Sequence, residues 1–148
     1  MWEQNKKTWT KKIILLVSVW VVLFALDLIS KYLFYNVWCC AHWIWVAKVF
    51  NTGISRGVAL PSFLTFLVSA LAIVLFVWLY IKNQFTWWMM ALIMAGTLGN
   101  LYDRIFLHGV RDFIAIGHFP VFNFADIWLN LGIFLFIIRE FRGIGKIE

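Results

Sequence analysis

The sequence predicts an all-α membrane protein, a four-transmembrane-helix bundle with a small extracytoplasmic β-like element between helices 1 and 2. Of the 148 residues, 64% are hydrophobic and only 14% are charged, whereas soluble domains are about 45–50% apolar. Four apolar runs each approach the length of about 20 residues that a helix needs to cross a bilayer. We therefore expect residues 1–148 to form a single integral membrane domain.

The four predicted spans are apolar runs that end at basic or polar residues. They cover residues 13–35, 58–81, 86–107 and 121–138. The first run is too long for the apolar region of a secretory signal peptide, and no small-residue cleavage site follows it, so we expect an uncleaved helix. In the second, Pro61 occupies the first turn, where its missing N–H removes no helical hydrogen bond.

The segment between the first two spans, residues 36–57, is too polar to cross a membrane. It contains β-favouring stretches, Trp43 to Val46 and Val49 to Phe50. We expect these stretches to form a small sheet-like element on the outer membrane surface.

The distribution of Lys and Arg predicts the orientation of the spans. Both ends of the chain and the loop after the second span share one side, with Lys6, Lys7, Lys11, Lys12, Lys82, Arg139, Arg142 and Lys146. The other side holds Lys48, Arg56, Arg104 and Arg111. Eight cations against four place both termini in the cytoplasm.

The net charge of +6 is attributed to contacts with anionic lipid headgroups, because the basic residues gather at the ends of apolar runs. No nucleic-acid motif is present, so nucleic acid is not an expected partner. The two cysteines, Cys39 and Cys40, are adjacent and lack zinc-binding spacing. We expect neither a metal nor a cofactor.

The four aspartates of the chain all fall within or beside a predicted span, near its outer end. Asp27, Asp103 and Asp126 should lie at a similar depth, with Asp112 on the loop above them. A charged side chain inside a bilayer costs about 2.5 kcal/mol or more. Intramembrane acids are therefore candidates for a functional site.

Other polar residues recur at helical spacing and should face the same place. They form three sets: Asp27 and Lys31; Gly96, Asn100, Asp103 and Arg104; and Asn123, Asp126 and Asn130. Together they predict a polar pocket open to the outside. A structural interpretation stays open for Asp27 with Lys31 and for Asp103 with Arg104, because such pairs also hold helices together.

Asp112 and Asp126 lack an obvious cationic partner. Arg111 precedes Asp112, but neighbours on an extended chain point in opposite directions. Two nearby carboxylates in a low-dielectric site cannot both ionise easily, so one holds a proton. The ionised acid can deprotonate water while the protonated acid donates to the substrate.

Motifs for other hydrolytic chemistry are absent. The sequence contains neither an H-E-x-x-H zinc motif nor a G-x-S-x-G nucleophile turn. Ser30 and Lys31 are adjacent, but a Ser–Lys dyad also requires the serine to line a pocket.

Five motifs in order resemble those of the lipoprotein signal peptidases (signal peptidase II), intramembrane aspartyl proteases of bacteria. They are Asp27 to Lys31 for D-x-x-[ST]-K, Asn51 to Gly53 for N-x-G, Gly96 to Arg104 for G-x-x-G-N-x-x-D-R, Gly109 to Phe113 for G-x-V-V-D-F, and Phe119 to Asp126 for F-P-x-F-N-x-A-D. The resemblance covers nearly the whole chain.

The resemblance implies a role for each matched residue. Asp112 and Asp126 would be the catalytic dyad. Hydrogen bonds that position substrate and dyad would come from Asn51, Asn100, Arg104 and Asn123. Polar support would come from Asp27, Lys31 and Asp103, and close backbone approach would be possible at Gly53 and Gly96.

The resemblance also implies the substrate and the setting. The enzyme would act as an aspartyl endopeptidase on diacylglyceryl-modified prolipoproteins, cutting before the lipidated cysteine and releasing the signal peptide. It would sit in the bacterial inner membrane with its site near the outer face. Its partners would be these substrates and membrane lipids, and nothing in the sequence requires more than a monomer.

Five residues, at three places in the chain, depart from the family pattern. Ile54, Ser55 and Arg56 stand where A-A-F is usual, Arg111 replaces an aliphatic residue, and Ile127 replaces a common serine. We expect these changes to affect substrate preference, inhibitor binding and pH dependence. Two alternative functions stay open, a proton- or ion-conducting membrane protein and a catalytically inactive lipoprotein binder.

Overall fold

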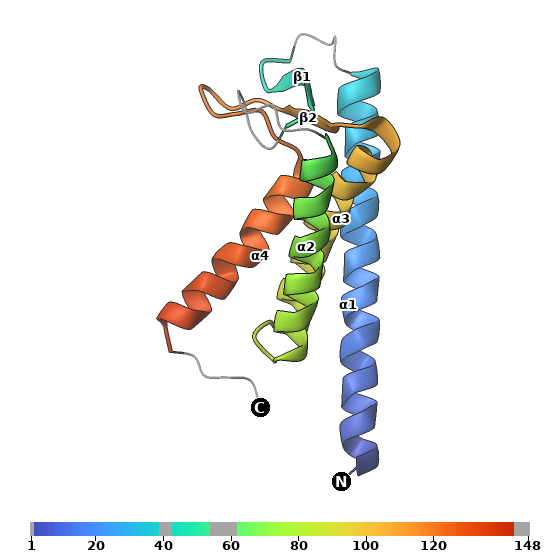
Figure 1. Cartoon of the computed structure of the whole chain (residues 1–148), viewed down its shortest axis with the longest axis vertical. Helices are drawn as coiled ribbons and strands as arrows, with labels where there is room; N and C mark the ends of the chain where they lie inside the picture. Colours follow the sequence, from blue (N-terminus) through green and yellow to red (C-terminus); the bar gives the residue numbers. More distant parts are fainter. Residues whose placement is uncertain (1, 39–42, 54–61, 144–148) are drawn as a thin grey trace.

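The computed structural model describes residues 2–38, 43–53 and 62–143, and within these ranges the chain is mostly helical. Its elements in chain order are α1 (Trp2–Ser30), the π-helix η1 (Lys31–Val37), β1 (Val46–Asn51), α2 (Ser62–Ile81), α3 (Trp87–Leu107), β2 (Val110–Ile114) and α4 (Phe124–Phe141). The two strands lie across one end of the helices, at the end opposite the start of α1 (Figure 1).

Two helical stretches among the described residues are long and apolar enough to cross a membrane. They are Thr8–Val37, which comprises most of α1 and all of η1, and Phe63–Ile81 within α2. Large apolar side chains on both are exposed, including Ile29 at 55% and Val74 at 67%. Exposed apolar faces of this extent indicate that lipid surrounds these helices.

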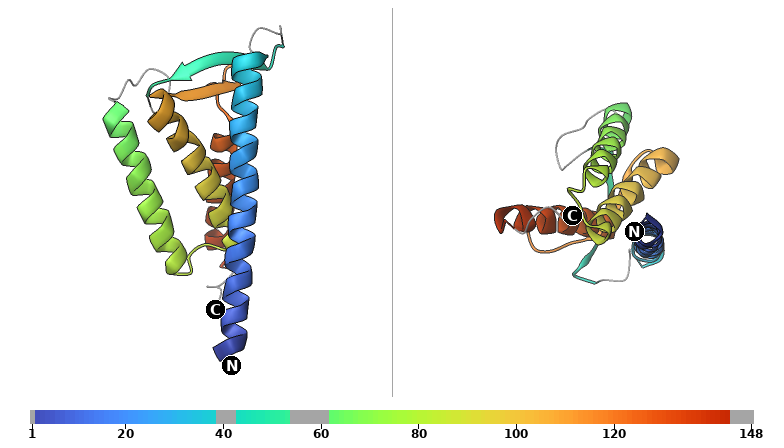
Figure 2. Two further views of the ribbon diagram at one scale, coloured as in Figure 1. Left: turned by 90° about the vertical axis from the view of Figure 1, so that its right-hand side faces the viewer. Right: turned by 90° about the horizontal axis from the view of Figure 1, so that it is seen from below.

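The central helix is α3, with α1, α2 and α4 arranged around it (Figure 2). Small residues let the helices approach closely. A side chain at Gly96 would collide with the carbonyl oxygen of Ala125, and a Cβ at Gly132 would lie 2.6 Å from Cγ1 of Ile93. The motif residue Gly96 therefore serves the contact between α3 and α4.

An apolar core lies at the end of α3 that is remote from the strands. Phe85, Met89, Met90 and Ile93 are buried there and pack with side chains of the neighbouring helices. The opposite half of α3 instead buries polar side chains, including Asn100 and Asp103. The polarity of the interior therefore changes along the bundle axis.

The helix boundaries follow local capping chemistry. Thr86 caps α3 by accepting a hydrogen bond from the N–H of Met89, and His108 ends this helix in the left-handed conformation (φ 64°). The predicted span 86–107 agrees closely with α3. The start of the predicted span 58–81 lies outside the described residues, while its described part is helical.

The sheet differs from the sequence prediction. It pairs β1 with β2 in antiparallel orientation, with Val49 opposite Asp112 and Asn51 opposite Val110. The β-like element therefore joins the segment before α2 to the segment after α3. Asp112 lies on a strand and not on the expected loop. The sequence did not reveal this strand, because β2 has only five residues and its partner β1 is distant in the chain.

The first and fourth helices also differ from the predicted spans. The first begins well before residue 13, and Asn36 and Val37 at its other end belong to η1 instead of the sheet element. The fourth begins at Phe124 instead of residue 121, because Asn123 caps it with its side chain. Capping thus overrides the apolar pattern of the preceding residues.

Candidate functional site

The four aspartates lie where β2 and η1 meet α1, α3 and the start of α4. Asp27 and Asp103 are fully buried, and Asp112 is 3% exposed. The side chain of Asp126 lines an adjoining groove. The structure therefore brings together acids from four separate segments of the chain.

Asp112 accepts hydrogen bonds from two asparagine side chains. Nδ2 of Asn123 lies 2.7 Å from Oδ1 of Asp112, and Nδ2 of Asn51 lies 3.2 Å from Oδ2. The backbone N–H of Gly53 donates to Oδ1 of Asn51 at 3.0 Å. This contact fixes the Asn51 amide with its N–H groups toward Asp112.

Asp126 is held by the N-terminus of α4 and by α3. Its carboxylate accepts from the backbone N–H of Asn123 at 3.1 Å, and the Asn123 side chain accepts from the N–H of Asp126 at 3.0 Å. These two bonds form a capping box. Nδ2 of Asn100 adds a further hydrogen bond of 2.7 Å to Oδ1 of Asp126.

Asn123 links the two acids. Its fully buried side chain donates to Asp112, also donates to Oδ1 of Asn100 at 3.1 Å, and accepts from the N–H of Asp126. Each polar atom of this amide therefore has a partner. The arrangement holds Asp112 and Asp126 in one connected network.

The pKa of the Asp112 carboxyl is raised from its ordinary value of 3.8 to about 7. Burial is the main cause, and the negative charge of Asp126 acts in the same direction. Hydrogen bonds from Asn51 and Asn123 and the charge of Lys31 oppose the rise. Near neutral pH, Asp112 can therefore hold or release a proton.

A buried ion-pair network adjoins the acid pair and contacts it through Asn100 and the start of α4. Nζ of Lys31 lies 2.8 Å from Asp27 and 3.5 Å from Asp103, and all three side chains are fully buried. The same ammonium donates to Oδ1 of Asn100 at 3.2 Å. The second oxygen of Asp27 accepts from the N–H of Ala125 at 2.8 Å, so this network also fixes the start of α4.

The cationic partner of Asp103 differs from the one that the sequence suggested. Asp103 pairs with Arg111 at 2.7 Å, rather than with its neighbour Arg104. Arg104 is half-buried, and its charge acts on Asp126, Asp112 and Asp103. Arg111 and Asp112 point to different partners, as expected for neighbours on a strand.

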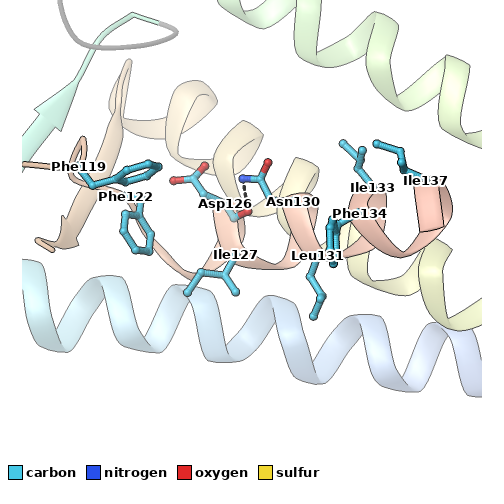
Figure 3. A pocket seen from close by; sticks show the side chains of 9 residues that line it. All are labelled: Phe119, Phe122, Asp126, Ile127, Asn130, Leu131, Ile133, Phe134 and Ile137. Carbon is cyan, nitrogen blue, oxygen red and sulfur yellow. Dashed lines mark hydrogen bonds between the residues drawn. The ribbon is translucent and has the colours of Figure 1, made fainter.

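An apolar groove runs along α4 from the acid site. Its volume is about 650 Å³, and Asp126 stands near one end, with Phe119 and Phe122 close by (Figure 3). Its remaining lining residues are Ile127, Asn130, Leu131, Ile133, Phe134 and Ile137. The sequence analysis did not single out Leu131, Ile133, Phe134 and Ile137, although residues 126, 130, 133 and 137 share the spacing of one helix face.

The site also sets limits on other chemistry. Among the described residues, no group of three or more His, Cys, Asp or Glu side chains could hold a metal ion. Ile54, Ser55 and Arg56, which depart from the family pattern, lie outside the described residues. The described groups are those of an acid pair that shares hydrogen-bond donors.

The fold and the site together define a helical membrane protein with buried acids beside an apolar groove. The family model of signal peptidase (SPase) II matches residues 19–142. The chain belongs to the signal peptidase II family.

Individual relatives support this assignment. The lipoprotein signal peptidase of Aquifex aeolicus is 34% identical over 143 residues, covering 86% of each chain. That of Pasteurella multocida is 38% identical over 140 residues, covering 82% of this chain and 85% of the relative. A bacterial membrane enzyme solved by the in meso method at 2.3 Å has the same fold, with a TM-score of 0.75, 24% identity and coverage of 92% of this chain and 93% of that chain.

Proposed function

We propose that this protein is an aspartyl endopeptidase that removes the signal peptide from diacylglyceryl-modified prolipoproteins, cutting before the lipidated cysteine. Membership of the signal peptidase II family supports lipoprotein processing. The observation that carries the aspartyl mechanism is the link from Asp112 through Asn123 to Asp126. The acids, not a metal or a covalent nucleophile, supply the groups that the reaction needs.

In the proposed mechanism, the acid pair carries one proton. Asp112 holds this proton, because burial raises its pKa to about 7. Asp126 is the ionised partner, since N–H groups of Asn100 and Asn123 stabilise its negative charge. Asp126 removes a proton from water, and the resulting hydroxyl oxygen bonds to the scissile carbonyl carbon.

Asp112 completes the reaction as the general acid. It donates its proton to the carbonyl oxygen as the tetrahedral intermediate forms. As this intermediate collapses and the C–N bond breaks, Asp126 gives the proton taken from water to the leaving amine, and one hydroxyl of the intermediate returns a proton to Asp112 as the carbonyl re-forms. The new N-terminus belongs to the lipidated cysteine, and the signal peptide leaves with the new carboxylate.

The groove along α4 provides a place for the lipid of the substrate. It is lined by apolar side chains, and Asp126 stands near its end. Acyl chains in this groove would anchor the lipidated cysteine beside the acid pair and orient the preceding peptide bond. Asn51, Arg104 and Gly53 would contribute to substrate positioning at the same end of the bundle.

We further propose that all four helices cross the bacterial inner membrane, with both termini in the cytoplasm. Helix α3 has 21 residues and α4 has 18, which correspond to about 32 Å and about 27 Å. Their polar faces are turned toward the interior network, so lipid meets the remaining apolar faces. The site would then lie near the outer surface, where it would act in a monomer.

An ion- or proton-conducting function is less well supported. A conduction path needs polar groups along its whole length. The acids instead gather at one end, and Phe85, Met89, Met90 and Ile93 fill the opposite end of the described core.

A cleavage assay in detergent or lipid tests the proposed function. The purified protein, its Asp126→Asn variant and its Glu140→Gln variant would be incubated with a prolipoprotein, with and without the diacylglyceryl group. Glu140 is an exposed acid at the remote end of α4, so it provides a matched control. We expect a gel shift only for the lipidated substrate, with wild type and Glu140→Gln but not with Asp126→Asn.

Two outcomes would contradict the proposal in different ways. Cleavage by Asp126→Asn would remove Asp126 from the reaction. Wild-type protein that binds the lipidated substrate without cutting it would instead indicate an inactive lipoprotein binder.

A further inference from the structure

Arg111 makes the most extensive polar contact of β2 with α3. Its guanidinium donates from Nη2 to Oδ1 of Asp103 at 2.7 Å and from Nε to Oδ2 at 3.2 Å. Its backbone N–H also donates to Oδ2 of Asp103, at 3.1 Å. This is a two-pronged ion pair reinforced by the main chain, and such pairs fix geometry as well as charge.

The contact fixes the strand residue that precedes Asp112. The side chain of Arg111 is only 11% exposed, and Asp103 is fully buried. Because the two neighbours point in opposite directions, anchoring Arg111 to α3 turns Asp112 toward Asn51 and Asn123. An aliphatic residue, which the motif that this sequence resembles has at this position, could not form this ion pair.

The charges of the site can be counted over the described residues. The acids are Asp27, Asp103, Asp112 and Asp126, and the cations are Lys31, Arg104 and Arg111. Four negative and three positive charges leave one negative charge, which one proton on the acid pair would neutralise. A buried site favours the neutral total, because desolvation penalises unbalanced charge.

We propose that Arg111 is a positioning residue that completes the charge balance of the site, so that the Asp112–Asp126 pair carries one proton while β2 stays fixed to α3. This inference rests on the proposed function. Without the Arg111 charge, neutrality would require two protons on the pair. The doubly protonated pair lacks an ionised acid to activate water.

The remaining charged groups near the pair do not replace Arg111. Lys48 on β1 is exposed and lies 4.9 Å over the ring of Tyr35, and His108 at the end of α3 is exposed. Helix α2 contributes no charged residue. Lys31 already lies between Asp27 and Asp103, and Arg104 already acts on the acid pair.

The test is the pH dependence of prolipoprotein cleavage in five variants. They are Arg111→Met, Arg111→Lys, Asp103→Asn, the double variant Asp103→Asn with Arg111→Met, and the control Arg142→Met, which removes an exposed cation at the remote end of α4. Wild type and Asp126→Asn are measured beside them, and helical content is checked for each.

Loss of a positive charge strengthens proton binding. In Arg111→Met, the acidic and the alkaline limb of the plot of cleavage rate against pH should therefore both move to higher pH, by roughly half a unit or more. Asp103→Asn should move them to lower pH, and the double variant should return near the wild-type profile. Arg111→Lys should keep the wild-type limbs with a lower kcat, because it retains the charge but loses the fork geometry.

Each result decides the proposal. An unchanged profile in Arg111→Met, or an equal shift in Arg142→Met, would overturn it. If Arg111→Met does not fold, Asp103→Asn tests the proposal instead. A rate profile of Asp103→Asn that is unchanged or moves to higher pH would overturn the proposal. Failure of wild type to cut, or cutting by Asp126→Asn, would instead contradict the proposed function.

Discussion

Asn123 serves both the fold and the acid pair. It caps α4, and the same amide group donates to Asp112. Asn51 acts on Asp112 from the other side, where the turn contact with Gly53 sets its orientation. The two asparagines oppose the effect of burial on the Asp112 pKa, so they help to set the pH range in which the pair holds one proton.

At the residue scale, we predict that Asn51→Ala slows cleavage about tenfold or more, because it leaves an oxygen of the buried Asp112 without its hydrogen-bond donor, and such a loss costs about 1–3 kcal/mol. The lost bond favoured the ionised form of Asp112, so its pKa should rise above about 7. The alkaline limb of the rate profile should then move to higher pH. Initial rates measured across pH check both effects.

Asn36→Ala is the control for this prediction, since Asn36 is exposed on η1. It should leave the rate and the profile unchanged. Wild-type kinetics in Asn51→Ala would mean that Asn51 does not act on the pair.

At the scale of elements, the contact between α3 and α4 connects packing to the site. Gly96 and Ala125 allow close approach of the two backbones. Ala125 donates its N–H to Asp27, and the next residue is Asp126. A change in helix separation would therefore move one acid relative to the others.

Gly96→Ala should destabilise the protein by about 1–3 kcal/mol, because the added methyl collides with the backbone of α4. This effect should outweigh the helix propensity of alanine, which favours Ala over Gly by about 1 kcal/mol. The midpoint of thermal unfolding in detergent measures the change. Val74→Leu, on the exposed face of α2, also adds one carbon and should leave the midpoint nearly unchanged.

The groove along α4 provides a second prediction at this scale. Phe134→Ala should raise KM for lipidated prolipoprotein roughly tenfold with little change in kcat, because apolar contacts that are equal in ground and transition states affect binding alone. Phe141→Ala is the matched control: it removes the same side chain from α4, outside the groove. Equal KM values for the two variants would exclude Phe134 from lipid binding.

At the scale of the whole molecule, polarity is divided along the bundle axis. The aspartate ion-pair network, its amides and the two strands occupy one end, while aromatic and methionine side chains fill the core at the other end. At that other end the buried Arg139 pairs with Glu140 and donates to the carbonyl oxygen of Gln84. The acids are thus gathered at one end of the bundle, where charged chemistry would take place.

The four-span arrangement predicts a labelling pattern. After Cys39 and Cys40 are replaced by serine, single cysteines at the exposed positions Ile116 and Phe141 would be treated with a membrane-impermeant maleimide. Cys at 116 should react in intact spheroplasts, and Cys at 141 only after permeabilisation. Protection at 116 would contradict outward placement of the segment between β2 and α4.

The sequence alone determined the helical membrane class, the motif residues and the convergence of polar helix faces. Apolar length and helical spacing are local properties, so a single chain reveals them. The separation of Asp27 and Lys31 by four positions left an ion pair open as one interpretation, and the structure contains this ion pair.

Only the tertiary structure decided the pairing of β1 with β2, the partner of Asp103 and the groove beside Asp126. Each depends on groups distant in sequence or on which face of α4 stays uncovered. Arg104 adjoins Asp103 in the chain, yet Arg111 binds it, because β2 crosses the end of α3. Side-chain direction and strand register select contacts that proximity in sequence does not specify.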